Sequence, residues 1–158
     1  MNGLQKFIVI LGRIFLSFIF ILAAINQIVD WSGAEESLVN ALNQSLTFYN
    51  DIDWIKELIQ LCLTWSSILM LIAVIFEIVG GLLVFFGIRP RFGAFLLLLF
   101  LIPTTFFFHG FWTLQGADRN LQMTIFLKNL SIFGGLLLLL TMDGHHKHSE
   151  ASEHETKI

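Results

Sequence analysis

Four ionisable side chains stand inside long apolar stretches of this chain, where charge is rarely found. Arg13 interrupts the first stretch, Glu77 the second, His109 the third and Lys128 the fourth. A charge at the centre of a bilayer costs about 2.5–3.5 kcal/mol or more, so such residues mark functional or packing sites. Together with Asn129, these four residues are the candidate members of a buried polar network or ligand pocket.

Small or polar residues accompany three of these charges at helical spacing. Gly80 and Gly81 share a helical face with Glu77. The companions of Arg13 are Ser17, Ala24 and Gln27, and those of Lys128 are Thr124, Ser131 and Gly135. Because small residues allow membrane helices to approach closely, the pattern predicts one internal polar seam. We expect Glu77 to pair with Lys128, with Arg13 or with both.

Two cations facing one acid leave one positive charge uncompensated. Three explanations stay open at this point. In the first, Lys128 is neutral, because burial disfavours the charged form of an amine. In the second, Asp30 at the end of the first stretch supplies the missing negative charge. In the third, the seam binds an anion or an electron-rich ligand. The third explanation is the functional hypothesis.

His109 follows Pro103 in the third stretch and shares a helical face with Thr105. Pro103 removes a backbone donor, which predicts a kink and a free carbonyl group at Leu99. His109 is either a proton relay and partner of a carbonyl ligand, or an interfacial histidine bonded to a neighbouring helix. One histidine at this depth excludes a bis-histidine haem within the chain, and the single cysteine, Cys62, excludes a cysteine-rich metal site. We therefore expect no metal.

The composition places these residues in a membrane protein. Apolar residues make up 56% of the 158 positions and charged residues 13%, against about 25% charged in ordinary globular chains. A span needs about 20 residues. The stretches of that length are Phe7–Ile25, Ser66–Ile88, Phe92–Trp112 and Leu121–Met142. The sequence predicts an all-α integral membrane four-helix bundle in residues 1–142, and its small net charge of −3 predicts no nucleic-acid partner.

The distribution of basic residues predicts how the chain is oriented. Lys6, Arg89, Arg91 and the lysines of the segment 143–158 flank one side of the membrane. The positive-inside rule places that side, with both termini, in the cytoplasm. Residues 143–158 are polar and are predicted to form a disordered cytoplasmic tail.

The outer loop 27–64 is the longest segment between spans. Its apolar residues at helical spacing are Leu38, Ala41, Leu42, Leu46 and Tyr49. They predict an amphipathic helix on the outer membrane surface. Ser32 and Glu35 match a capping box, which predicts that this helix starts after Ser32. Asp51 and Asp53 begin a further helical stretch that leads into the second span.

Several segments carry a resemblance to a known family. They are Leu11–Arg13 and Ile25–Gln27 in the first span, Glu77–Leu83 with Gly87 and Arg91, Leu101–Trp112, and Gln122–Gly135. Over nearly all of residues 7–140 the chain resembles the DoxX family of small four-helix bacterial membrane proteins. The resemblance implies a multi-pass protein of the bacterial inner (cytoplasmic) membrane. Members of the family are linked to quinone-dependent membrane oxidoreductases and to redox stress.

The resulting hypothesis is a subunit of a quinone-linked membrane oxidoreductase or redox-stress system. It carries no covalently bound cofactor, and the polar network lines a pocket for a quinone headgroup. Whether the chain is itself an enzyme stays open, and no catalytic residue is assigned. The alternatives are a non-catalytic adaptor that docks a membrane or periplasmic protein through the loop 27–64, and a small transporter. The lipid bilayer is the partner common to all three.

Overall fold

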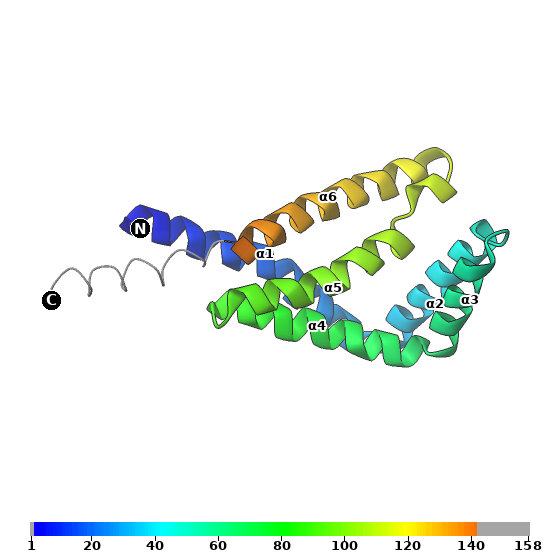
Figure 1. Ribbon diagram of the computed structural model, residues 1–158, viewed down its shortest axis with the longest axis horizontal. Coiled ribbons are helices and arrows are strands. Elements are labelled where there is room, and N and C mark those ends of the chain that lie inside the picture. The colour runs from blue at the N-terminus through cyan, green and yellow to red at the C-terminus, as the bar shows by residue number, and fades with distance from the viewer. Residues whose placement is uncertain (1, 142–158) are drawn as a thin grey trace, which may run out of the picture.

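The computed structural model describes residues 2–141, which fold into six α-helices, one short 3₁₀ helix and no strand. Four helical segments are long and apolar enough to cross a membrane (Figure 1). These findings confirm the predicted all-α architecture with four spans. The predicted tail, residues 143–158, lies outside the described part of the chain. The orientation with both termini in the cytoplasm stays a prediction.

The first span, α1 (Gly3–Val29), is longer than the bilayer core is thick. Its 27 residues extend over about 40 Å, whereas the hydrocarbon core measures about 30 Å. α1 packs antiparallel on the second span, α4 (Ser66–Phe86). Its N-terminal part continues past the turn between α4 and α5 (Figure 1).

The closest helix pair in the fold is α4 with α5 (Pro90–Phe108). A Cβ atom on Gly80 would lie 2.9 Å from the carbonyl oxygen of Gly93, and one on Gly93 would lie 2.8 Å from that of Gly80. The two backbones therefore approach at a pair of residues that lack side chains. The tight turn between the helices uses Gly87, at φ 72°, and Arg89, at φ 54°.

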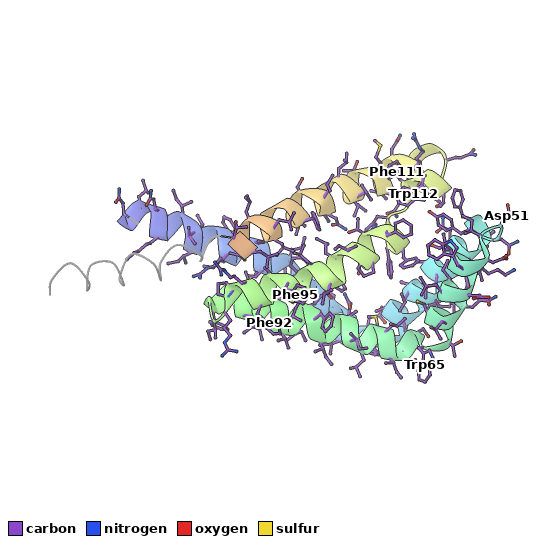
Figure 2. The ribbon with its side chains drawn as sticks, viewed as in Figure 1. Asp51, Trp65, Phe92, Phe95, Phe111 and Trp112 are labelled. Carbon is purple, nitrogen blue, oxygen red and sulfur yellow. The ribbon has the colours of Figure 1, made fainter. Side chains whose placement is uncertain are left out.

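The last span, α6 (Gly116–Thr141), packs on α5, so the strongest contacts run in the order α1, α4, α5, α6. The buried core residues come from all four of these helices. They are Phe20, Val84, Ala94, Leu97, Leu98, Leu101, Leu136 and Leu139. The outer faces carry large apolar side chains instead, such as Phe92 and Phe95 at 53% and 48% exposure (Figure 2). Such faces suit contact with lipid.

Two further helices, α2 (Trp31–Phe48) and α3 (Asp53–Thr64), lie side by side and form the α2–α3 hairpin. The hairpin stands at the end of the spans opposite the α4–α5 turn (Figure 1). Asp51 lies at its tip, and Trp65 lies where α3 meets α4 (Figure 2). α2 corresponds to the predicted helix of the loop, whose place on the membrane surface stays a prediction, and α3 corresponds to the further helical stretch predicted from Asp51 and Asp53. A change of direction at Trp65 separates α3 from the second span.

The start of α2 differs from the predicted one. α2 begins one residue before Ser32, because Asp30 is the N-cap and its Oδ1 accepts a hydrogen bond of 3.1 Å from the Gly33 amide. Aspartate is as good an N-cap as serine, and α1 already ends at the preceding residue. The predicted third span, Phe92–Trp112, lies within the membrane span Pro90–Thr113 of the structure. In this span α5 ends at Phe108, and a 3₁₀ helix, η1 (Phe111–Thr113), follows.

Candidate functional site

The buried carboxyl group of Glu77 has an amide, not a cation, as its hydrogen-bond partner. Glu77 lies in the middle of α4 and is 1% exposed. Gln27, in the last turn of α1, donates a hydrogen bond of 2.7 Å from Nε2 to Glu77 Oε2. The sequence placed Gln27 on the inner face of the first span but did not make it a site residue. The feature of the sequence that could have identified it is its position, because Gln27 is a polar side chain four helical turns from Arg13 on the same face of the first span.

The predicted pairing of Glu77 with Arg13 is wrong. The guanidinium group of Arg13 lies against Gly87 at the C-terminus of α4. Gly87 is ten residues from Glu77, which is about 15 Å along a helix. The antiparallel register of α1 and α4 explains the difference. That register brings Gln27 level with Glu77 and carries Arg13 to the opposite end of the same helix.

The predicted contribution of Lys128 to an internal seam is also wrong. Lys128 is exposed, as are its companions Thr124 and Ser131. The neighbouring residue Asn129 is buried instead, and its Nδ2 donates a hydrogen bond of 3.0 Å to the hydroxyl group of Thr105. Adjacent residues differ by about 100° around a helix, so the rotation of α6 turns Asn129 inward and Lys128 outward.

His109 occupies the C-cap position of α5 and bonds to α6. Its Nδ1 lies 2.7 Å from Oε1 of Gln122. An amide oxygen only accepts hydrogen bonds, so Nδ1 carries the proton and Nε2 is left for another partner. In a neutral ring Nε2 accepts a hydrogen bond, and in a charged ring it donates one.

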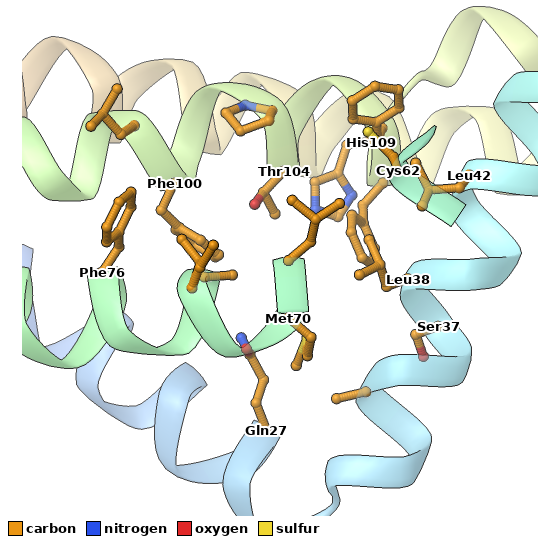
Figure 3. A pocket seen from close by; sticks show the side chains of 18 residues that line it. Gln27, Ser37, Leu38, Leu42, Cys62, Met70, Phe76, Phe100, Thr104 and His109 are labelled. Atoms are coloured by element: carbon orange, nitrogen blue, oxygen red, sulfur yellow. The ribbon is translucent and has the colours of Figure 1, made fainter. Parts of the chain in front are cut away.

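A cavity of about 450 Å³ opens between the spans and the α2–α3 hairpin (Figure 3). Helices α2, α4 and α5 supply most of its mainly apolar wall, and α1 and α3 supply one residue each. Its polar lining residues are Gln27, Ser37, Cys62, Thr104 and His109. This volume and this mixture of many apolar with few polar groups are typical of pockets for small molecules.

Polar groups face the cavity from two sides. Gln27 reaches it from α1, while Thr104 and His109 lie on the α5 side (Figure 3). Leu99 and Pro103 line it as well, and Pro103 leaves the carbonyl group of Leu99 without its usual helical donor. The cavity thus joins the predicted site residue His109, together with Pro103, to a residue one hydrogen bond away from Glu77.

Side-chain contacts hold the hairpin to the end of α5 and to the start of α4. The Trp112 indole donates a hydrogen bond of 2.9 Å to the hydroxyl group of Tyr49, and the Tyr49 ring stacks on Phe106 with centroids 6.1 Å apart. Near the start of α4, the Ser67 hydroxyl bonds to the Glu35 carboxylate. The hairpin is therefore fastened to both helices that flank the cavity.

The described residues, 2–141, hold no group of three or more histidine, cysteine, aspartate or glutamate side chains suited to a metal ion. The polar atoms around the cavity are hydrogen-bond donors and acceptors. The cavity can therefore bind an apolar molecule, and its polar lining groups can orient the polar end of that molecule.

The family model described as DoxX matches residues 8–110, which covers α1 from Ile8 onward, the hairpin, α4 and α5. The chain belongs to the DoxX family. The segment Gln122–Gly135 of α6, which contributed to the resemblance, lies beyond the matched residues.

Two other comparisons add no relative to the DoxX assignment. Neither the search of curated proteins nor the search of solved structures gave a match.

Proposed function

We propose that this DoxX-family protein binds a quinone or quinol in the cavity, as a subunit of a quinone-linked membrane redox system. The single observation that carries the proposal is the position of Gln27 on one side of the cavity and His109 on the other (Figure 3). A quinone has an apolar body with polar oxygens at opposite edges of its ring. A cavity with an apolar wall and polar groups on opposing sides suits that shape.

The two side chains suit both redox forms of such a ligand. Because Gln27 Nε2 donates to Glu77, the amide oxygen of Gln27 is left to accept a bond from a quinol hydroxyl group. Nε2 of His109 can accept from a hydroxyl group or donate to a carbonyl group, since Gln122 occupies only Nδ1. In this proposal Glu77 is a positioning residue, which fixes the orientation of the Gln27 amide.

Binding of a short-chain benzoquinone to purified protein in detergent, measured by equilibrium dialysis, tests the proposal. We expect Gln27→Leu and His109→Phe each to weaken binding about tenfold, as loss of a hydrogen bond worth about 1.4 kcal/mol would. Gln60→Leu, at an exposed position of α3, should leave binding unchanged. Absence of saturable binding to the unaltered protein would refute the proposal.

A pair of volume variants tests whether the cavity is the binding site. Ala73 lines the cavity, so Ala73→Phe should fill part of it and abolish quinone binding. Ile75, on the same helix, is 47% exposed and is not a lining residue. Ile75→Phe adds a comparable aromatic ring and should not affect binding. Equal effects of the two variants would place the quinone elsewhere.

A second candidate function, docking of a partner protein, is favoured by one surface of α3. Trp54, Leu58, Leu61 and Trp65 recur at helical spacing and are 69%, 47%, 57% and 53% exposed. Such a row of exposed apolar residues is typical of a docking or membrane-contacting face. If it docks a partner, Leu58→Glu should abolish recovery of that partner from mild detergent, whereas Gln60→Glu and Ala73→Phe should not. Loss of the partner in Ala73→Phe alone would favour the cavity instead.

The orientation also belongs to this proposal. We place the α2–α3 hairpin on the outer side of the bacterial inner membrane, with both termini in the cytoplasm. The support is the set of basic residues at the opposite end, Lys6, Arg89 and Arg91. In a Cys62→Ser background, a membrane-impermeant thiol reagent added to whole spheroplasts should label Gln60→Cys in the hairpin and not Lys6→Cys. The reverse pattern would invert the topology.

A further inference from the structure

The end of the molecule opposite the hairpin carries a concentration of positive charge. Lys6 and Arg13 of α1, Arg89 of the α4–α5 turn and Arg91 at the start of α5 belong to this end. The acidic residues among positions 2–141 lie elsewhere. They are Asp30, Glu35, Glu36, Asp51, Asp53, Glu57, Glu77 and Asp118. Within the described residues, these cations therefore have no acid at their own end of the spans.

Two of these arginines hold buried polar atoms that make no hydrogen bond. The Nε atoms of Arg13 and Arg91 are both buried and without a partner within the described chain. Most buried side-chain polar atoms in proteins are hydrogen-bonded, so each exception requires an explanation. The negative end of the α4 helix dipole attracts the Arg13 guanidinium toward Gly87, but this attraction does not satisfy its Nε–H group.

Gly87 shapes the space that holds the Arg13 side chain. A Cβ atom on Gly87 would collide with the guanidinium group, and the φ of 72° at this residue also favours glycine. Arg89 and Arg91 follow Gly87 by two and four residues. The Arg13 guanidinium group, from α1, thus lies against the segment of the chain that carries Arg89 and Arg91.

The depth of Arg13 points to a lipid rather than a dissolved anion. Arg13 is six residues inside Phe7, where the apolar run of α1 begins, which corresponds to about 9 Å. Toward the hairpin, α1 continues with the exposed apolar residues Phe15, Phe18, Ile19 and Leu22. An arginine below the membrane surface draws lipid headgroups toward itself. Basic pockets between membrane helices are sites for phosphate-bearing headgroups.

We propose that Arg13 and Arg91, with Arg89, form a binding site for the phosphate group of an anionic phospholipid at the α4–α5 turn. A guanidinium fork presents paired N–H donors, which matches the oxygens of a phosphate group. The acyl chains of the lipid lie along the exposed apolar face of α1. This site is separate from the cavity and does not depend on quinone binding.

Native mass spectrometry in detergent tests this site with defined lipids. The protein should retain phosphatidylglycerol at least about fivefold more than phosphatidylcholine, since each arginine near a membrane surface contributes a factor of about five. Arg13→Gln and Arg91→Gln should each lower this preference about fivefold. Lys128→Gln removes an exposed cation on α6 and should leave it unchanged. A wild-type protein without preference for phosphatidylglycerol would overturn the proposal.

Two further measurements separate the alternatives. Arg13→Lys keeps the charge but loses the fork, so it should retain only part of the preference. Inorganic phosphate at millimolar concentration should not displace the lipid. Equal binding of phosphate alone would make the ligand a dissolved anion and refute the lipid site. If Arg13→Gln does not fold, the lipid comparison in the unaltered protein and in Arg91→Gln still decides the outcome.

Discussion

Gln27 donates a hydrogen bond of 2.7 Å to Glu77, two residues that are 50 positions apart in the chain. This bond joins the last turn of α1 to the middle of α4, where the side chain of Glu77 is 1% exposed. A membrane helix with a buried acid needs a partner for it, and here an amide fills that role. The amide also lines the cavity, so one side chain connects the buried carboxyl group to the candidate ligand site.

The first prediction concerns this bond. Gln27→Leu should lower the free energy of unfolding by about 1–3 kcal/mol, because the buried Glu77 carboxyl group loses its hydrogen-bond partner. Unfolding of the purified protein in detergent, followed by circular dichroism, measures the change. The control Gln60→Leu removes an exposed amide and should stay within about 0.5 kcal/mol of the wild type. Equal stability of the two variants would show that the bond contributes nothing.

The second prediction concerns the close approach of α4 and α5. Gly80→Ala should destabilise the fold by about 1–3 kcal/mol, since the new methyl group would meet the carbonyl oxygen of Gly93 and the side chain of Leu97. Gly134→Ala is the matched control, because a Cβ atom there has nothing within 4 Å. It should be neutral or slightly stabilising, as alanine is the better helix former. Thermal unfolding of the two variants in the same detergent distinguishes these outcomes.

The third prediction decides which residue caps α2. Asp30→Ala should cost about 1 kcal/mol, because the Gly33 amide loses the carboxylate that accepts its hydrogen bond. Ser32→Ala should change stability by less than about 0.5 kcal/mol, since Ser32 is exposed and already inside the helix. Hydrogen exchange of the first-turn amides of α2 reports the effect locally. Faster exchange in Ser32→Ala than in Asp30→Ala would restore the capping-box prediction.

The fourth prediction uses Cys62, the single cysteine, as a reporter on the cavity wall. Burial raises the pKa of its thiol above the ordinary value. Because only the thiolate reacts, alkylation at neutral pH should be slower than for an exposed cysteine. The rate should rise with pH, and its midpoint should lie at higher pH than that of the exposed cysteine. The comparison is Gln60→Cys in a Cys62→Ser background.

The same reporter tests occupation of the cavity. A short-chain quinone should slow alkylation of Cys62 and leave alkylation of the cysteine at position 60 unchanged, because only the former lines the cavity. Protection of both cysteines would indicate a general effect of the quinone on the reagent or on the detergent. Absence of protection at Cys62 would count against the cavity as the quinone site.

The local sequence pattern was sufficient to predict the four spans and the inner faces of two of them. The lengths of the apolar runs predict four membrane helices, and Ser17, Ala24, Gly80 and Gly81 are buried as their helical spacing indicates. These properties depend on residues within a few turns of each other. A helix period fixes which side chains share a face, whatever the face packs against.

Only the tertiary structure decided which side chains contact one another. Whether Glu77 meets Arg13 or Gln27 depends on the register of α1 against α4, and whether Lys128 or Asn129 turns inward depends on the rotation of α6. Register and rotation follow from close packing between helices far apart in the chain, such as the contact of Gly81 in α4 with Ile21 in α1. The sequence alone determined four membrane spans with an acid buried in the second. The cavity, whose wall comes from five helices, exists only once those helices are packed together.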